Sequence, residues 1–147
     1  MNAFKLFCLA GLVTAMAGAA MAVAPSFVTV SNAWFRMLPA GLPAGGYFTL
    51  RNKTDSELQL TGGRSEACGM LMLHKSEEES GMSRMSEVPT VDVRAHGAIS
   101  FRPGGLHLMC TAPTSAMKLN TAVSVRLEFS NGTKVTVSFL VRNAQGE

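Results

Sequence analysis

The stretch SVRLEFSNGTKVTVSFLV, residues 124–141, shows the clearest alternation of apolar and polar residues in the chain. Apolar side chains recur at every second position on both sides of Asn131-Gly132. Because successive side chains of a strand point to opposite faces, each half predicts a strand with one buried face. Asn-Gly between two such runs predicts a hairpin with a type I′ turn, since both residues tolerate a positive φ. The stretch therefore favours an all-β fold.

Shorter apolar runs bounded by turn residues predict six further strands upstream of this hairpin. The expected strands are residues 27–30, 45–52, 58–61, 70–74, 99–101 and 106–110. About eight strands in total is typical of a two-sheet β-sandwich. Trp34 and Phe35 are expected in its core because of their size. No internal repeat or linker divides the chain, so one domain is expected.

Residues 1–22 differ from the rest and predict a signal peptide ahead of a domain at residues 23–147. Lys5 precedes an apolar segment that ends in Ala20-Met21-Ala22, an A-x-A cleavage site. An uncleaved anchor is the alternative, although about 17 apolar residues are at the short limit for a membrane span. Cys8 does not indicate a lipidated N-terminus, because it lies too early in the sequence and lacks the small residues expected beside a lipidated cysteine.

Composition excludes several classes of protein. The chain has 147 residues, of which 47% are hydrophobic and 16% charged, enough to bury a core. Removing Lys5 with the signal peptide lowers the formal net charge from +3 to +2. A chain this close to neutral, without a dense basic stripe, is not expected to bind nucleic acid. No second segment predicts stable insertion in a membrane after cleavage.

Two cysteines, Cys68 and Cys110, remain after the signal peptide is removed. An even number of cysteines in an exported chain allows a structural disulfide. Two separate thiols are the alternative, with Cys110 as an occasional metal ligand.

The segment LHLMC, residues 106–110, places a histidine and a methionine within an apolar run. Strand alternation puts His107 and Met109 on one face, about 7 Å apart at their Cα atoms. Leu106, Leu108 and Cys110 then face the core.

The segment MLMLHK, residues 70–75, shows the same division. Alternation turns Leu71 and Leu73 inward, and Met70, Met72 and His74 outward. Because an apolar core does not require methionine on its outer face, the outward residues are candidates for another role.

Imidazole and thioether groups together form a soft, uncharged donor set that suits Cu(I). Zinc would be expected to recruit thiolate, imidazole or carboxylate, and calcium or magnesium would require oxygen ligands. Flexible methionine arms also allow ligand exchange. The candidate ligands are His74, Met85, His107 and Met109, each of which taken alone could instead be a packing residue.

The spacing of these four residues, H-x10-M-x21-H-x-M, resembles the signature of the PCu(A)C family of periplasmic copper chaperones. The segments AWFRMLPAG, AGGYFTLRN, RPGGLHLM and LEFSNGTKVTV are also similar to that family. The resemblance implies a cupredoxin-like Greek-key β-sandwich that binds Cu(I) on the four residues. It implies delivery of copper to a periplasmic acceptor, such as a cytochrome oxidase subunit or its assembly factor. Lys75 replaces an optional methionine of the signature, and Leu106 replaces a frequent tyrosine.

Two other functions stay open at this point. A cupredoxin-type electron carrier shares the fold but needs a thiolate in a His2Cys set, and Cys110 is predicted to face inward. A structural or adhesive sandwich would bind no metal. An enzyme is not expected, because the chain lacks a C-x-x-C pair and a Ser/His/Asp arrangement. A role in copper tolerance rather than delivery is equally compatible with the sequence.

The remaining signals are weaker. Residues 75–84 are predicted to be a solvated connection, in which Glu77, Glu78 and Glu79 make no metal site. His96 is expected in a turn beside Gly97. Met82 is expected to pack or remain free, unless the connection folds over the metal. Four further methionines are assigned to packing or surface positions, with Met72 the strongest exception: Met37, Met70, Met72 and Met117.

Overall fold

The structure is a computed structural model that describes residues 26–147. The expected signal peptide, residues 1–22, lies outside the described part. The described chain is all-β apart from one 3-10 turn, η1, so the predicted fold class is confirmed. The strands are β1 Val28–Arg36, β2 Ala44–Asn52, β3 Leu58–Arg64, β4 Cys68–Glu79, β5 Met82–Glu87, β6 Val91–Val93, β7 Ala98–Phe101, β8 Leu106–Pro113, β9 Ala122–Phe129 and β10 Lys134–Arg142, with η1 at Pro39–Gly41.

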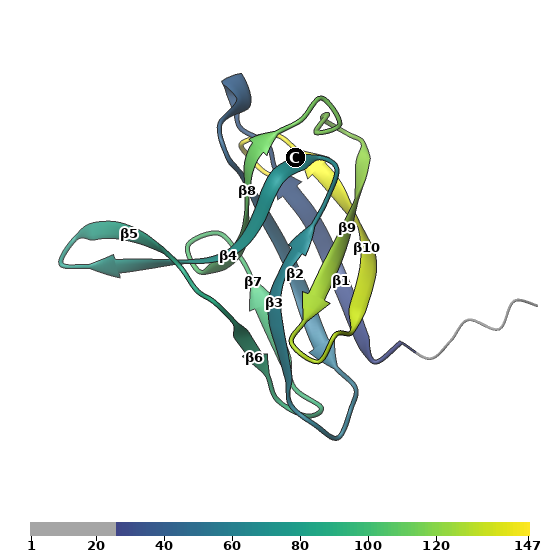
Figure 1. Cartoon of the computed structure of the whole chain (residues 1–147). Coiled ribbons are helices and arrows are strands. Elements are labelled where there is room, and N and C mark those ends of the chain that lie inside the picture. Colours follow the sequence, from purple (N-terminus) through teal and green to yellow (C-terminus); the bar gives the residue numbers. More distant parts are fainter. Residues whose placement is uncertain (1–25) are drawn as a thin grey trace, which may run out of the picture.

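The strands form one continuous path in the order β5-β4-β8-β2-β1-β10-β9-β3-β6, and β7 pairs with β2 (Figure 1). All pairs are antiparallel except β1 with β10, which is parallel. The path curls until β3 lies beside β4, where a Cβ built on Gly62 would be 3.5 Å from the carbonyl oxygen of Leu71. The inner faces of the curled sheet therefore enclose a single core. Within residues 26–147, no helix has the length and apolar character needed to cross a bilayer.

The C-terminal hairpin supplies much of that core. Val125, Leu127, Phe139 and Val141 are fully buried, as the alternation predicts. Burying each of these side chains contributes about 1.5–3 kcal/mol of transfer free energy.

The turn of this hairpin differs from the expected type I′ geometry. Gly132 has a φ of 84°, but Asn131 does not adopt a positive φ. The amide of Gly132 donates to the carbonyl of Phe129, and the amide of Thr133 donates to the Asn131 side chain. One extra residue thus enters the turn, and only the glycine requires the left-handed conformation.

Residues 26–147 contain ten strands rather than about eight, because two strands were not predicted: β5, which begins within the expected connection at residues 75–84, and the three-residue strand β6. β4 continues through this segment to Glu79, and β5 returns from Met82 in register with it. The turn between them uses Ser80 and Gly81, both at positive φ. The segment is exposed, as expected, but it forms a hairpin that extends away from the body of the sheet (Figure 1). Neither face of this hairpin packs on the core, so its sequence has no apolar alternation to mark it as strand.

A disulfide links Cys68 of β4 to Cys110 of β8, with their Cα atoms 5.3 Å apart. The two cysteines are therefore paired, and the alternative of two separate thiols is wrong. It ties together the two strands that carry His74 and His107. It also leaves no thiolate on Cys110 to act as a metal ligand.

Candidate metal centre

The pairing of β4 with β8 brings the predicted histidines together. His74 lies directly opposite His107, and Met72 lies directly opposite Met109. Directly opposed residues of an antiparallel pair project from the same face, with Cβ atoms about 4.5–5.5 Å apart. The four side chains therefore share one patch on one face of the β4–β8 ladder, which we call the His/Met face.

The inward and outward sides of these strands follow the predicted alternation. Leu71, Leu73, Leu108 and Cys110 are buried in the core. Leu106, at the start of β8, is partly buried and packs against the same core. The His/Met face is the opposite side of the same two strands.

The outward orientation predicted for His107 does not leave its ring exposed. His107 is only 4% exposed, because the ring of Tyr47 on the neighbouring strand β2 lies beside it. The two ring centroids are 6.4 Å apart, and the ring of Trp34 lies 4.8 Å from that of Tyr47. Trp34 therefore belongs to this outer aromatic wall, whereas Phe35, the next residue, is fully buried in the core as predicted.

Gly45 explains how Tyr47 reaches this position. A Cβ at Gly45 would lie 2.5 Å from the phenolic oxygen of Tyr47, so only glycine lets the ring lie over β2. Gly45 is also opposite both Met109 of β8 and Arg36 of β1. This aromatic wall was not predicted from the sequence, although the glycine pair Gly45-Gly46 directly before Tyr47 indicates a close approach to the backbone.

A backbone hydrogen bond sets the protonation pattern of the His107 ring. Its Nδ1 is 2.9 Å from the carbonyl oxygen of Gly105, which can only accept, so Nδ1 carries the proton and Nε2 has the free lone pair in the neutral ring. Burial lowers the pKa of His107, with His74 and Arg36 adding to the effect and the Gly105 bond opposing it. Metal-binding imidazoles are neutral and commonly held by such a bond to the second nitrogen.

His74 lies beside it, with the two imidazole centroids 5.9 Å apart. Both ring nitrogens of His74 are buried, and neither has a hydrogen-bond partner among residues 26–147. A buried polar nitrogen without a partner costs about 1–3 kcal/mol. A ligand that accepts the lone pair of one nitrogen would remove part of that cost, so the residue fits a metal site.

Met85 lies on β5, the strand that pairs with β4 on the side away from β8. It is directly opposite Ser76, which is two residues after His74 and on the same face of β4. Met85 is therefore a diagonal neighbour of His74, at a distance of about 7–8 Å typical for such pairs. Its side chain is 55% exposed and belongs to the projecting hairpin.

Two weaker candidates lie elsewhere. Met82 is opposite Glu79, so it projects from the other face of the hairpin, away from Met85. His96 occupies a turn with a φ of 56° and its Nε2 is 2.7 Å from Asp55 Oδ1. The expectation that His96 is a turn residue is thus confirmed.

The donor chemistry of the His/Met face is nitrogen and sulfur. No group of three or more His, Cys, Asp or Glu side chains within residues 26–147 is arranged to hold a metal. The acidic residues of the hairpin instead pair locally, Glu77 with Lys75 and Glu79 with Arg84. A metal on this face would depend on imidazole and thioether ligands.

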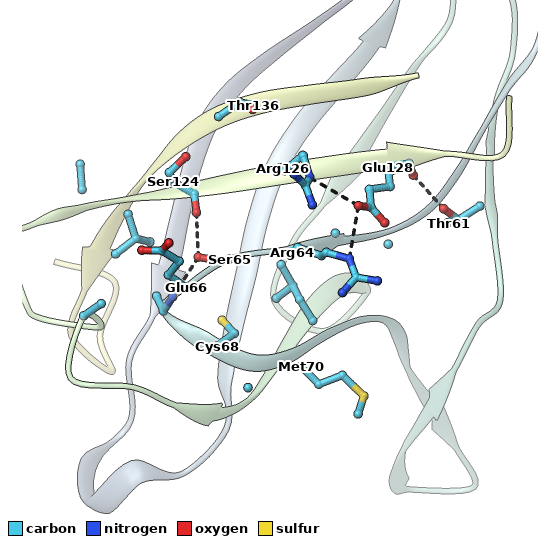
Figure 2. A pocket seen from close by; sticks show the side chains of 18 residues that line it. Thr61, Arg64, Ser65, Glu66, Cys68, Met70, Ser124, Arg126, Glu128 and Thr136 are labelled. Carbon is cyan, nitrogen blue, oxygen red and sulfur yellow. Dashed lines mark hydrogen bonds and ion pairs between the residues drawn. The ribbon is translucent and has the colours of Figure 1, made fainter. Parts of the chain in front are cut away.

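A groove of about 1010 Å³ is a separate feature between β3, β9 and β4. Figure 2 shows Arg64 and Arg126 converging on Glu128, each at 3.4 Å. Met70 and Cys68 line its β4 side, but the four predicted ligands do not. The groove therefore does not form part of the candidate metal centre.

Comparison with known sequences relates the chain to proteins described as lipoproteins. The profile of the family described as "Putative lipoprotein LpqE-like" matches residues 28–141. A protein of Leifsonia xyli subsp. xyli described as "Putative lipoprotein" is 27% identical over 120 residues, which cover 81% of this chain and 72% of that protein.

Comparison with solved structures shows the fold. The copper-bound PCuAC domain from PmoF2 superposes with a TM-score of 0.66 at 17% identity, covering 82% of this chain and 97% of that domain. The solution structure of CuI-DR1885 from Deinococcus radiodurans gives a TM-score of 0.62 at 23% identity, covering 84% and 81%. The chain therefore has the fold of PCuAC domains.

Proposed function

The chain belongs to the LpqE-like family, and from that premise we propose that it is an exported metallochaperone that carries Cu(I). The proposed ligands are His74, Met85, His107 and Met109. The proposed export rests on the signal peptide expected at residues 1–22 and on the description of the relatives as lipoproteins.

One observation carries the proposal. His74 and His107 are opposed on neighbouring strands, the His74 ring has two buried nitrogens without partners, and the His107 ring directs its proton to a backbone carbonyl. A pair of structural histidines would be expected to satisfy these nitrogens within the fold. Met109 is two residues after His107 on the same face of β8, and Met85 is a diagonal neighbour of His74.

The donor set favours Cu(I) over other common metals. Two imidazoles and two thioethers are neutral, so the site would keep a single positive charge with a Cu(I) ion. Soft sulfur ligands select Cu(I), whereas calcium and magnesium require oxygen ligands that this face does not offer. The similarity in fold to a copper-bound PCuAC domain and to CuI-DR1885 supports the same assignment.

Copper is the cargo in this proposal, and delivery would proceed by ligand exchange. Met85 is exposed on a hairpin outside the core, where an acceptor ligand can replace its sulfur. The acidic residues Glu77–Glu79 of that hairpin would meet a basic patch on the acceptor. We propose a periplasmic copper protein as acceptor, such as a cytochrome oxidase subunit or its assembly factor. The protein would act in copper homeostasis without catalysing a reaction.

The rival functions make different demands. An electron carrier of the cupredoxin type needs a cysteine thiolate, and both cysteines within residues 26–147 form a disulfide. A structural or adhesive sandwich gives no reason for two unpartnered imidazole nitrogens beside two methionines.

A Cu(I) titration of residues 23–147 against a chromophoric chelator tests the proposal. We expect one tightly bound Cu(I) and a loss of more than about a hundredfold in affinity, or about 2.8 kcal/mol, in Met85→Leu/Met109→Leu. Met70→Leu/Met82→Leu is the matched control, because it removes two exposed methionines outside the proposed ligand set. Absence of Cu(I) binding, or equal affinities for the two double variants, would refute the ligand assignment.

Delivery needs its own experiment. Copper-loaded protein is mixed with the apo copper domain of an oxidase subunit, and copper is followed after separation of the two. Transfer on contact that is faster than release to buffer supports a chaperone. Retention of the copper by this protein would favour sequestration instead.

A further inference from the structure

We propose that Met72 is an additional Cu(I) donor, which completes a site inside the β4–β8 ladder and exchanges with Met85 on the hairpin. The inference rests on the proposed function, because it concerns the same ion. It assigns a ligand that lies outside the H-x10-M-x21-H-x-M spacing.

Strand register places Met72 closer to the centre of the site than Met85. Met72 is directly opposite Met109, and the next pair along on the same face is His74 with His107. Opposed Cβ atoms are about 4.5–5.5 Å apart, and successive pairs on one face are about 7 Å apart along the strand. The Cβ atoms of these two methionines and two histidines thus lie at the corners of one small rectangle. Met85, by contrast, is only diagonal to His74 and comes from a third strand.

Packing does not account for Met72. The residues that form the core or pack against it include Met37 and Met117, as the sequence analysis expected. Among the described residues, neither Met72 nor Met109 belongs to that set. Both are nevertheless partly buried on the His/Met face, where the neighbouring pairs on the same face are His74 with His107 and Met70 with Thr111. Partial burial of a thioether ligand limits competition by water for the ion.

Met70 is a methionine of the same strand that lies outside the proposed site, so its exposure can be compared with that of Met72. It projects from the same face as Met72 but is opposite Thr111, one step farther from the histidines. Its side chain is 57% exposed. Met70 therefore serves as the control for exposure, residue type and strand.

Five donors exceed what a four-coordinate ion uses, and this surplus provides a path for exchange. With Met72, Met109, His74 and His107 bound, the sulfur of Met85 is not coordinated. Binding of Met85 breaks the bond between copper and Met72, and the reverse step restores it. One copper–sulfur bond forms as another breaks, and the copper remains Cu(I) throughout. Met72 would keep the ion within the β4–β8 ladder, and exchange to Met85 would place the ion at the exposed hairpin, where an acceptor can bind it.

Methyl NMR on the wild-type domain tests this without mutation. Methionine methyl groups are labelled with ¹³C, and Ag(I) is added as a redox-inert probe of the Cu(I) site. We expect the signals of Met72, Met109 and Met85 to shift, and those of Met70 and Met82 to remain in place. An unshifted Met72 signal would overturn the inference.

Variants then measure the exchange. We expect Met85→Leu to retain Cu(I) with a loss of no more than about tenfold in affinity, and Met72→Leu/Met85→Leu to lose more than about a hundredfold. Met70→Leu/Met85→Leu should match Met85→Leu alone. Circular dichroism and thermal unfolding confirm that each variant is folded, which is expected because Met→Leu conserves volume.

The outcomes separate the two proposals. If the wild type binds no Cu(I), the proposed function itself is wrong. If the wild type binds Cu(I) and needs Met85 and Met109, but Met72→Leu/Met85→Leu equals Met85→Leu, only the role of Met72 is refuted.

Discussion

Two hairpins of this protein differ in how much of their surface is buried. In β9–β10, every second residue is apolar and turns toward the core, where Leu127 and Phe139 are fully buried. In the outer part of β4–β5, every residue of β5 is exposed. The first hairpin is held by tertiary packing, whereas the second is held by its own backbone pairing and local ion pairs. Because β5 does not pack on the core, its side chains are accessible to a binding partner.

The largest expected effect separates the two hairpins by stability. Leu127→Ala should lower the free energy of unfolding by about 2–5 kcal/mol, because it leaves a cavity in a fully packed region. Met85→Ala should change it by less than about 0.5 kcal/mol, because the side chain is exposed. Urea unfolding followed by circular dichroism measures both. Similar losses would show that the projecting hairpin is part of the core.

The second largest loss of stability is expected on removal of the disulfide, which links β4 to β8. Cys68→Ala/Cys110→Ala is expected to lose about 2–4 kcal/mol, because the reduced chain gains freedom in its unfolded state. Chemical denaturation with and without a reductant measures this. The reduced wild type is the control and should be destabilised similarly, and an unchanged midpoint in both would contradict a stabilising bond.

A smaller effect is expected at the aromatic wall. Gly45→Ala places a Cβ against the Tyr47 ring and should cost about 1–3 kcal/mol as the ring is displaced. Gly105→Ala is the matched control, since its nearest neighbour would be 3.5 Å away. Thermal unfolding compares the two. Equal melting temperatures would mean that the Tyr47 ring moves aside without penalty.

The smallest effect concerns protonation of His107 in the metal-free protein. Burial lowers the pKa of His107, so an NMR titration should give a value below 6.5. The neutral ring then favours the folded state above pH 6.5, and this contribution is lost as the pH falls through the lowered pKa. Gly45→Ala should move the pKa back toward 6.5 as Tyr47 uncovers the ring. A wild-type pKa at or above 6.5 would contradict the burial of His107.

Alternation made some parts of the molecule predictable. It identified the C-terminal hairpin, the inward leucines of β4 and β8, and the shared face of His107 and Met109, because one buried face imposes a period of two. It failed for β5, where no face is buried and no period arises. The prediction from size that Trp34 joins Phe35 in the core is wrong, since adjacent strand residues point to opposite faces.

The sequence by itself determined the all-β class, the orientation of side chains along each strand and the spacing that nominates four ligands. These properties follow from local stereochemistry and from the need to bury apolar surface. Only the tertiary structure decided which residues are opposed: His74 with His107, Met72 with Met109, and Cys68 joined to Cys110. Register between strands distant in sequence depends on the packing of the whole core, and no local pattern encodes it.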